Sequence, residues 1–345
     1  MRIFAAPADD GGCGTYRIRL PARALAMRGH EVFIHSNLAA GLEREGQPFA
    51  ITSDVIFTQR LHEPGVSEVW QRHLRTITRA KLVMDIDDDF LSLTPDNPVY
   101  PMWNDLDRRR RLRDNLRCAD AITVTNHALA ARISRLAPHA RVSIHPNSLP
   151  GALRAVLSPA TTSHGSQVWV GWAGSATHAR DVGQLAYPLR EVLHQFRHVR
   201  FISVGGTYPS FPPETVVLDW EDDYDAYMRT ISSFDIGLAP LRVSRFNDCK
   251  SDIKILEYMG LGIPWIASNT GPYAQHKSLH NVAGILVNSL NEWCDALEKL
   301  IANPGLRQSM GEAGKRYAAT RSIELAAVDY ERLFERLSSN DRVKG

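Results

Sequence analysis

The segment from Lys250 to Ser268, KSDIKILEYMGLGIPWIAS, combines residue types that could bind a nucleotide diphosphate. Its apolar residues follow a helical spacing that Gly260 and Gly262 end, and Asp252 stands where a helix N-cap is expected. The unpaired amides and the dipole of a helix N-terminus favour an anion. Glu257 follows on the same helix, and a carboxylate can accept two hydrogen bonds from the vicinal diol of a ribose. An ordinary capped amphipathic helix explains the same residues.

A glycine-rich loop follows the first strand expected from the sequence, RIFAA at residues 2–6. A helical pattern and a second strand at residues 31–36 come next, an order that favours a right-handed crossover and a parallel sheet. Gly12 and Gly14 would let a ligand approach the backbone at the carboxyl end of the first strand. The spacing is not GxGxxG and no acidic residue ends the second strand, which argues against a nicotinamide dinucleotide. A tight turn without a ligand is the alternative.

Four aspartates, Asp85, Asp87, Asp88 and Asp89, end the strand pattern of residues 80–89. A DxD at a strand end could hold Mg or Mn together with a diphosphate, because hard cations prefer carboxylate oxygens. Acidic residues also cap and solvate strand ends. We predict no metal site and keep metal binding by this cluster as an alternative.

Six arginines, Arg108 to Arg111, Arg113 and Arg117, lie in a predicted helix over residues 104–119. Such a cluster could bind the phosphates of a nucleic acid or of a phospholipid. A solvated helix face is the commoner outcome for a run that also contains aspartates, and we favour it.

The composition is that of a globular protein, with 345 residues, 44% hydrophobic residues and 23% charged residues. The net charge of +2 is too balanced to indicate a nucleic-acid or membrane partner by itself. The four cysteines show neither a CxxC pair nor zinc spacing, so we expect reduced thiols and a cytoplasmic location. No run approaches the ~20 apolar residues of a membrane span, which leaves peripheral membrane contact open.

The alternation of strands and helices begins again after a segment rich in Pro, Ser and Thr, which predicts two α/β domains. We expect an N-terminal domain over residues 1–155 and a linker over residues 156–166. A C-terminal domain would span residues 167–320. Residues 321–345 would form a last helix that packs back toward the N-terminal domain. The pattern predicts two helices after the strand at residues 284–287, one over residues 289–304 and the last over residues 323–339.

Several stretches resemble the GT-B glycosyltransferases. The opening GGCGTYRIRLPARALAMRGHEVFIHS is similar to the first unit of these proteins, and ADAITVTN with RVSIHPNSLP is similar to the end of their first domain. VWVGWAGSATHARDV, RFISVGG, FDIGLAPL and KSDIKILEYMGLGIPWIAS resemble the donor-binding domain of retaining members of family 4. The resemblance implies two Rossmann-like domains facing a central cleft, with a nucleotide-sugar donor on the second domain and an acceptor on the first.

The resemblance also implies roles for individual residues. Glu257 matches the glutamate that holds the donor ribose, Lys250 lies in the loop that faces the diphosphate, and Lys254 follows on the same element. Gly12 and Gly14 match the glycine loop that faces the donor phosphates and sugar. The other residues expected to bind the donor are Gly171, Gly174, Ser175, His178, Arg180, Gly205, Ser251, Asp252 and Ile253.

The sequence departs from the family pattern at two places. A second glutamate commonly precedes the ribose glutamate by eight residues; here that position is Cys249, and Asp248 is one residue off. Trp172 occupies the place of the usual arginine in the first loop of the donor domain, so His178 or Arg180 must stand for the usual lysine.

These residues predict a retaining glycosyltransferase that moves a hexosyl or related sugar from a nucleotide-diphosphate donor to a hydroxyl group. Lys250, Lys254, Arg180 and the helix N-terminus would stabilise the leaving diphosphate without a metal. Asp248 and His127 are further candidates for the catalytic step. The expected donor is a UDP-sugar, with a GDP-sugar as the alternative, and no cofactor is required.

The expected acceptor is a glycan, a lipid-linked sugar or a hydroxylated base in DNA, the last through Arg108–Arg113. Two other functions stay open. One is a metal-dependent transferase of the GT-A kind that uses Asp85–Asp89. The other is a nucleotide-sugar-binding protein without chemistry, an alternative raised by Cys249.

Overall fold

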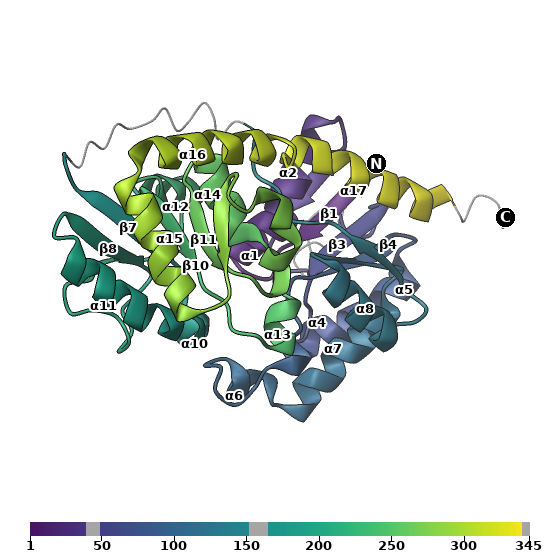
Figure 1. The fold of residues 1–345 in the computed structure, drawn as a ribbon. Helices are drawn as coiled ribbons and strands as arrows, with labels where there is room; N and C mark the ends of the chain where they lie inside the picture. Colours follow the sequence, from purple (N-terminus) through teal and green to yellow (C-terminus); the bar gives the residue numbers. More distant parts are fainter. Residues whose placement is uncertain (39–48, 152–164, 340–345) are drawn as a thin grey trace. The chain divides into compact units, whose positions relative to one another are not determined.

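The computed structural model describes residues 1–38, 49–151 and 165–339, and these form two compact units (Figure 1). The first unit contains Met1–Pro150, Cys249–Ser251 and Ser322–Gly345, and the second contains Gly151–Asp248 and Asp252–Arg321. Residues 156–164 of the predicted linker lie outside the described residues.

The first unit is built on a parallel sheet of six strands in the order β2-β1-β3-β4-β5-β6. The central strands are buried on both faces, as expected for short apolar runs in a parallel sheet. The strands are β1 (Arg2–Ala6), β2 (Glu31–Ile34), β3 (Val55–Gln59), β4 (Lys81–Ile86), β5 (Ala121–Val124) and β6 (Arg141–Ile144).

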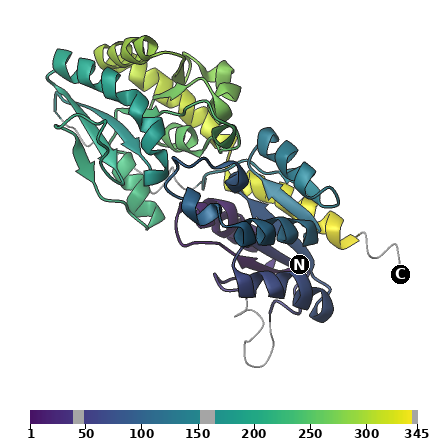
Figure 2. The same cartoon turned by 90° about the horizontal axis from the view of Figure 1, so that it is seen from below.

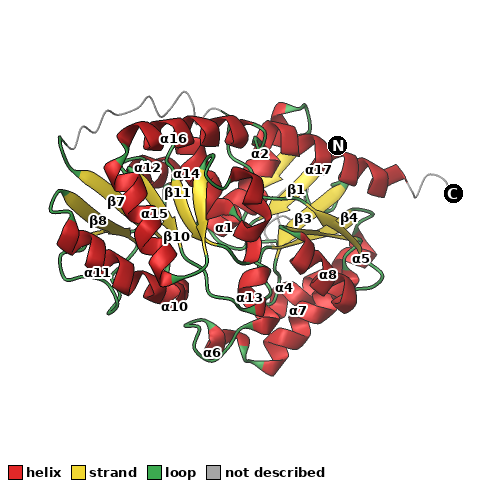
Figure 3. Cartoon of the chain, viewed as in Figure 1, coloured by secondary structure: helices red, strands yellow, loops and turns green. Residues whose placement is uncertain are grey.

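Helices flank these strands (Figure 3). Three adjoining helical pieces span residues 64–77, and Pro64 lies in the first turn, where its fixed φ and its missing N–H are well tolerated. The helical elements are α1 (Gly12–Gly14), η1 (Thr15–Arg19), α2 (Leu20–Met27), α4 (Pro64–Glu68), η2 (Val69–His73), α5 (Leu74–Ile77), η3 (Phe90–Ser92), α6 (Tyr100–Trp103), α7 (Leu106–Cys118), α8 (His127–Leu136) and α17 (Ile323–Ser339).

The last helix, α17, packs in the first unit, and Figure 2 shows it in yellow beside the strands of that unit. Tyr330 and Phe334 are buried in the same apolar core as Ile3 and Phe57, and the rings of Phe57 and Phe334 meet with centroids 5.5 Å apart. The core of the first unit thus needs the C-terminal end of the chain.

The second unit repeats the architecture with a parallel sheet in the order β12-β11-β10-β7-β8-β9. Its strands are β7 (Val168–Ala173), β8 (Val199–Val204), β9 (Val216–Leu218), β10 (Ile236–Ala239), β11 (Trp265–Ser268) and β12 (Gly284–Val287). Its helical elements are η4 (Ala176–His178), α10 (Ala179–Val182), η5 (Gly183–Leu185), α11 (Ala186–Gln195), α12 (Tyr224–Ile231), α13 (Arg245–Asp248), α14 (Ile253–Leu261), η6 (Gly271–Leu279), α15 (Leu290–Ala302) and α16 (Pro304–Ala319).

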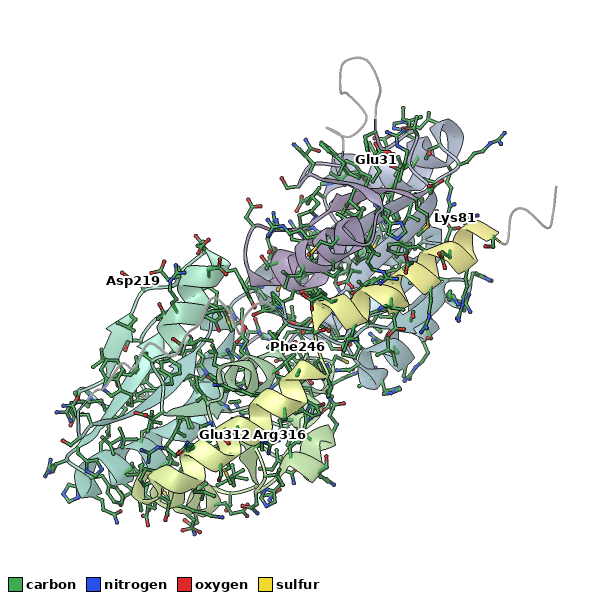
Figure 4. The ribbon with its side chains drawn as sticks, turned by 90° about the horizontal axis from the view of Figure 1, so that it is seen from above. Glu31, Lys81, Asp219, Phe246, Glu312 and Arg316 are labelled. Carbon is green, nitrogen blue, oxygen red and sulfur yellow. The ribbon has the colours of Figure 1, made fainter. Side chains whose placement is uncertain are left out.

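The sequence prediction of two helices after β12 was wrong, because α16 stands between α15 and α17. The glycines of this segment suggested a loop, whereas the structure uses two of them for close packing. A Cβ on Gly311 would lie 2.0 Å from the carbonyl oxygen of Gly262, and one on Gly314 would lie 3.1 Å from Cγ of Met259. Figure 4 shows Glu312 and Arg316 on the exposed side of this helix.

The close approach at Gly311 predicts a large effect of one methyl group. We expect Gly311→Ala to lower the free energy of unfolding by about 1–3 kcal/mol, because the new Cβ overpacks the contact with α14. Gly305→Ala is the matched control on the same helix, since a Cβ there meets nothing within 4 Å. Urea denaturation of both variants checks this, and equal stabilities would contradict close packing at Gly311.

Candidate functional site in the second unit

Helix α14 packs closely on the second sheet because glycine residues leave room for it. Gly237 on β10 leaves room for the ring of Tyr258, because a Cβ there would lie 2.5 Å from that ring. The Tyr258 hydroxyl donates to the carbonyl of Leu238 at 3.1 Å. Gly262 ends the helix with φ of 75°, a left-handed conformation that glycine adopts without strain. The packing of Tyr258 against β10 therefore fixes the position of α14 on the sheet.

Asp252 occupies the N-cap position, as the sequence predicted, but its side chain has another task. The buried carboxylate accepts hydrogen bonds from Arg321 at 2.9 and 3.1 Å and lies 2.9 Å from Nε2 of His276. Burial would raise the pKa of Asp252, yet the bonds from His276 and Arg321 lower it to about 2. Asp252 therefore occupies the predicted N-cap position, and its side chain makes no capping hydrogen bond to the helix amides.

Glu257 lies one turn further along α14 and is 3% exposed. Its Oε2 accepts a hydrogen bond from the hydroxyl of Tyr227 on α12 at 3.0 Å. Burial and the neighbouring Glu257 raise the pKa of Tyr227 well above its usual value, so the phenol stays a donor. The carboxylate is thus fixed in orientation by a group from another helix.

Lys254 is on the same turn of α14, and its ammonium group donates to the carbonyl oxygen of Ala173 at the end of β7. Gly174 follows Ala173, and its amide donates to the carbonyl of Val204 at 3.0 Å. The structure therefore brings Lys254 and Gly174 together at the carboxyl ends of β7 and β8.

Gly205 follows β8 with φ of 96°, a conformation that favours glycine. A Cβ there would lie 2.6 Å from the carbonyl oxygen of Gly174. Gly171, by contrast, lies inside β7, and its missing side chain makes room for the ring of Phe234, which a Cβ at this position would overlap at 2.1 Å. Packing accounts for Gly171, whereas Gly174 and Gly205 lie where the two strands end.

The loop after β7 carries Ser175, His178 and Arg180. His178 lies 3.0 Å from Oδ2 of Asp181, while Ser175 and Arg180 are exposed. Asp181 also accepts from the amide of Arg242 at 3.0 Å and from the side chain of Asn247 at 2.9 Å. Asp181 thus ties the loop after β7 to the loop after β10, a role that the sequence did not indicate.

Trp172, which stands in the place of an expected arginine, is 1% exposed. Its ring packs edge-on against Tyr208 and Phe211, with centroids 5.3 and 6.0 Å apart. The indole therefore serves the core of the second unit.

The second unit also contains a cavity of about 290 Å³ at the carboxyl ends of β10, β11 and β12. Polar side chains line much of it, among them those of Gln184, Ser268, Asn269 and Asn288. Its lining contains none of the residues that the sequence predicted for the site.

Candidate residues in the first unit

The loop Cys249–Ser251 belongs to the first unit and is anchored there by two asparagines. The side-chain amide of Asn126 donates to the carbonyl of Lys250 at 2.7 Å, and that of Asn147 donates to Oγ of Ser251 at 3.0 Å. Cys249 is 4% exposed, so the residue at the expected glutamate position is a buried thiol. Neither asparagine carried a signal in the sequence beyond its place after a predicted strand.

Lys250 forms an ion pair with Asp88 at 3.4 Å. Burial raises the pKa of Asp88 to about 6, although the lysine acts in the opposite direction. Lys250 therefore has an anionic partner within the first unit.

The remaining sequence candidates are Gly12, Gly14 and His127 of this unit and Asp248 of the second unit. Gly12 is exposed and a Cβ there would meet nothing within 4 Å, whereas a Cβ on Gly14 would lie 2.0 Å from the carbonyl of Asp9. His127 is exposed on the first turn of α8. Asp248, which ends α13 of the second unit, is also exposed.

Each aspartate of the acidic cluster has a cationic partner within the unit. Asp85 is buried and forms two hydrogen bonds with Arg17, at 3.0 and 2.7 Å. The other pairs are Asp87 with Arg60 at 3.0 Å, Asp88 with Lys250 at 3.4 Å and Asp89 with Arg132 at 3.2 Å. A divalent cation at this cluster would compete with these side chains for the same oxygens.

The arginines of α7 are largely used within the first unit. Arg108 pairs with Glu63 at 3.1 Å, Arg109 donates to the carbonyl of Leu91 at 2.9 Å, and Arg111 donates to that of His62 at 2.8 Å. Arg110 and Arg117 pair with aspartates on their own helix. These contacts favour the interpretation of a structural, solvated helix face over a phosphate-binding one.

Two further properties concern the described residues as a whole. Among residues 1–38, 49–151 and 165–339, no helix is long and apolar enough to cross a membrane. Within those same ranges, no three His, Cys, Asp or Glu side chains are grouped so that they could hold a metal ion.

Similarity to known proteins

Residues 184–336 match a protein family described as glycosyl transferase-like. No curated protein sequence matches the chain. Sucrose-phosphate synthase from Thermosynechococcus elongatus has a similar structure, with 16% identity, a TM-score of 0.66 and 98% of each chain covered. HepE from Anabaena in complex with UDP-glucose gives 15% identity, a TM-score of 0.64 and 98% coverage of each chain.

The α,α-trehalose 6-phosphate synthase of Burkholderia multivorans is also similar, with 12% identity and a TM-score of 0.60 over 84% of this chain and 72% of that one. The similar structures confirm the predicted α/β fold of two Rossmann-like GT-B domains. The family match confirms the resemblance to glycosyltransferases and, at that level, the prediction of a glycosyltransferase enzyme.

The environment of Asp252 predicts a pH dependence of stability. The folded-state pKa of about 2 lies below the usual 3.8, so the stabilisation is present above pH 4 and is lost as the pH falls toward 2. A shift of this size corresponds to roughly 2–3 kcal/mol. We expect the stability difference between the wild type and Asp252→Asn to shrink from pH 5 to pH 2 in urea titrations. A difference independent of pH over this range would contradict the assignment.

Proposed function

We propose that this glycosyltransferase moves a hexosyl or related sugar from a UDP-sugar to a hydroxyl acceptor, with retention of anomeric configuration. The observation that carries the proposal is the arrangement on α14, where a buried, oriented carboxylate and a lysine share one face next to a helix N-terminus. The complex of HepE with UDP-glucose supports the choice of a UDP-sugar donor over a GDP-sugar.

Glu257 would accept hydrogen bonds from the two hydroxyl groups of the donor ribose. A carboxylate can accept several hydrogen bonds, and Tyr227 donates one of them to Oε2 of Glu257. The donation from Tyr227 holds the carboxylate in position before the donor arrives, which reduces the ordering cost of binding.

The diphosphate would lie at the N-terminus of α14. The first amides of the helix and the Lys254 ammonium group supply donors and positive charge where the leaving group becomes negative. We include Ile253, Ser251 and Lys250 in this group because they lie close to the helix start in the chain. Lys250 would exchange its partner Asp88 for the diphosphate when the donor binds.

We also propose that the diphosphate lies close to Gly205 and to four residues that follow β7: Gly174, Ser175, His178 and Arg180. Gly12, Gly14, His127 and Asp248 remain predictions from the sequence for the sugar and the acceptor side. This assignment is metal-independent, because cationic side chains and helix amides supply the stabilisation that a divalent ion gives in other transferases.

A glycan or a lipid-linked sugar is the acceptor that we favour. Arg108, Arg109 and Arg111, three of the arginines proposed for DNA, make contacts within their own unit, which leaves the DNA alternative with less support. A nucleotide-sugar-binding protein without catalytic activity is the other alternative, because Cys249 replaces the expected acid. Activity measurements distinguish this alternative from a transferase.

Variants of α14 test the donor site. We expect Glu257→Gln and Lys254→Met each to weaken UDP-sugar turnover by about 10²-fold or more, because each removes a group that contacts the donor or the leaving diphosphate. Lys315→Met, an exposed lysine on α16, is the matched control. Turnover unchanged in both α14 variants, with folding confirmed by circular dichroism, would rule out the proposed site.

The metal independence and the stereochemistry are tested by one reaction. We expect donor turnover to persist in excess EDTA and the product to keep the α or β configuration of the donor sugar, as read by ¹H NMR coupling constants. Loss of turnover in EDTA that Mn²⁺ restores would favour the metal-dependent alternative at Asp85–Asp89. An inverted anomeric centre would contradict the retaining mechanism.

A further inference from the structure

Trp220 is a large aromatic residue that the second unit leaves 41% exposed. It lies two residues beyond β9, the edge strand of the sheet, and Figure 4 labels its neighbour Asp219 at the surface of this unit. A tryptophan that served the core would be buried, as Trp172 and Trp265 are in the same unit. The exposed indole therefore calls for another explanation.

The indole contacts a strand-end glycine and the tyrosine that orients Glu257. A Cβ on Gly205 would lie 3.0 Å from Cε3 of Trp220, so the absence of a side chain lets the ring approach the backbone. The indole also packs against Tyr227, with ring centroids 5.1 Å apart and an interplanar angle of 38°.

These contacts form a closed series around the ends of β7 and β8. Tyr227 donates to Glu257, Glu257 shares a helix face with Lys254, and Lys254 donates to Ala173, the residue before Gly174. Gly174 meets Gly205, and Gly205 meets Trp220. The series runs from a cation through a carboxylate to an exposed aromatic ring, which is the order of groups that a diphosphate, a ribose and a base require.

The charged residues next to Trp220 favour a base over a phosphate at this end of the series. Asp219, Glu221 and Asp222 lie next to it in the chain, and their carboxylates repel a phosphate. A neutral base is not repelled, and its N–H groups can donate to carboxylates. The acidic end of the series thus accepts the base, while the end at Lys254 accepts the diphosphate.

We propose that Trp220 is the stacking platform for the nucleobase of the donor and that Tyr227 is a positioning residue that supports both this platform and the Glu257 carboxylate. The inference rests on the proposed function, since it names the base subsite of the same donor site. Every base has a π face, so the platform supplies affinity for the nucleoside end of the donor and no affinity for the diphosphate alone.

The test is calorimetric titration of the full chain with UDP and with inorganic pyrophosphate. We expect Trp220→Ala to weaken UDP binding by about 10- to 100-fold and to leave pyrophosphate binding within about 3-fold. Trp220→Phe, which keeps an aromatic face, should retain UDP binding within about 5-fold. Val217→Ala is the matched control, because Val217 is similarly exposed on the neighbouring edge strand, at 45%.

A second variant distinguishes the stacking role of Trp220 from the positioning role of Tyr227. We expect Tyr227→Phe to keep the ring beneath Trp220 and to weaken UDP binding by removing the hydrogen bond to Glu257, again without effect on pyrophosphate. UDP affinity unchanged in Trp220→Ala would overturn the platform, and if Glu257→Gln still loses UDP binding, the donor site itself stands. UDP affinity unchanged in both Trp220→Ala and Glu257→Gln would overturn the proposed function together with this inference.

Discussion

The buried carboxylate of Glu257, held by the hydroxyl of Tyr227, is the interaction on which the proposed donor site depends. A carboxylate that is 3% exposed must be hydrogen-bonded, because burial of an unpaired charge is costly. Tyr227 on α12 donates one hydrogen bond to this carboxylate. In the proposed site, a ribose with two adjacent hydroxyl groups would donate further hydrogen bonds to Glu257.

Helix α14 can present this carboxylate because its two ends are fixed by different means. Arg321 and His276 hold Asp252 at the first turn, while Gly262 and Gly311 allow α16 to pack against the last turn. The side chain in the N-cap position makes no hydrogen bond to the first amides of the helix, where the proposed diphosphate site lies. In the first unit, each aspartate of the acidic cluster is likewise paired with a cationic side chain.

The alternation of apolar runs with helical patterns was enough to predict both sheets and the positions of most strands. The α/β class follows because short buried runs such as KLVMDI and WIAS fit a parallel sheet covered on both faces. Helix α16 was missed because local propensity treats Gly311 and Gly314 as breakers, while their packing against α14 is a tertiary property. The residues of α14 could be named from the sequence because they lie within one short element.

The partners of those residues come from distant parts of the chain and carry no local signal. Tyr227 has the pattern of an ordinary apolar position in an amphipathic helix, and its bond to Glu257 spans 30 residues. Trp220 follows a short edge strand, and its importance appears only where it meets Gly205. Gly171 shows the reverse case, since a glycine that fits a ligand loop in the sequence is needed for the ring of Phe234.

Hydrogen–deuterium exchange with and without UDP tests the central claim, that α14 and its neighbours form a nucleotide site, most directly. We expect UDP to slow amide exchange in residues 252–257, at the first turns of α14, and in residues 220–227. The cavity-lining residues 268–270 and 288–290 would then exchange as in the free protein. Protection confined to the cavity segments, or unchanged exchange throughout at saturating UDP, would contradict the claim.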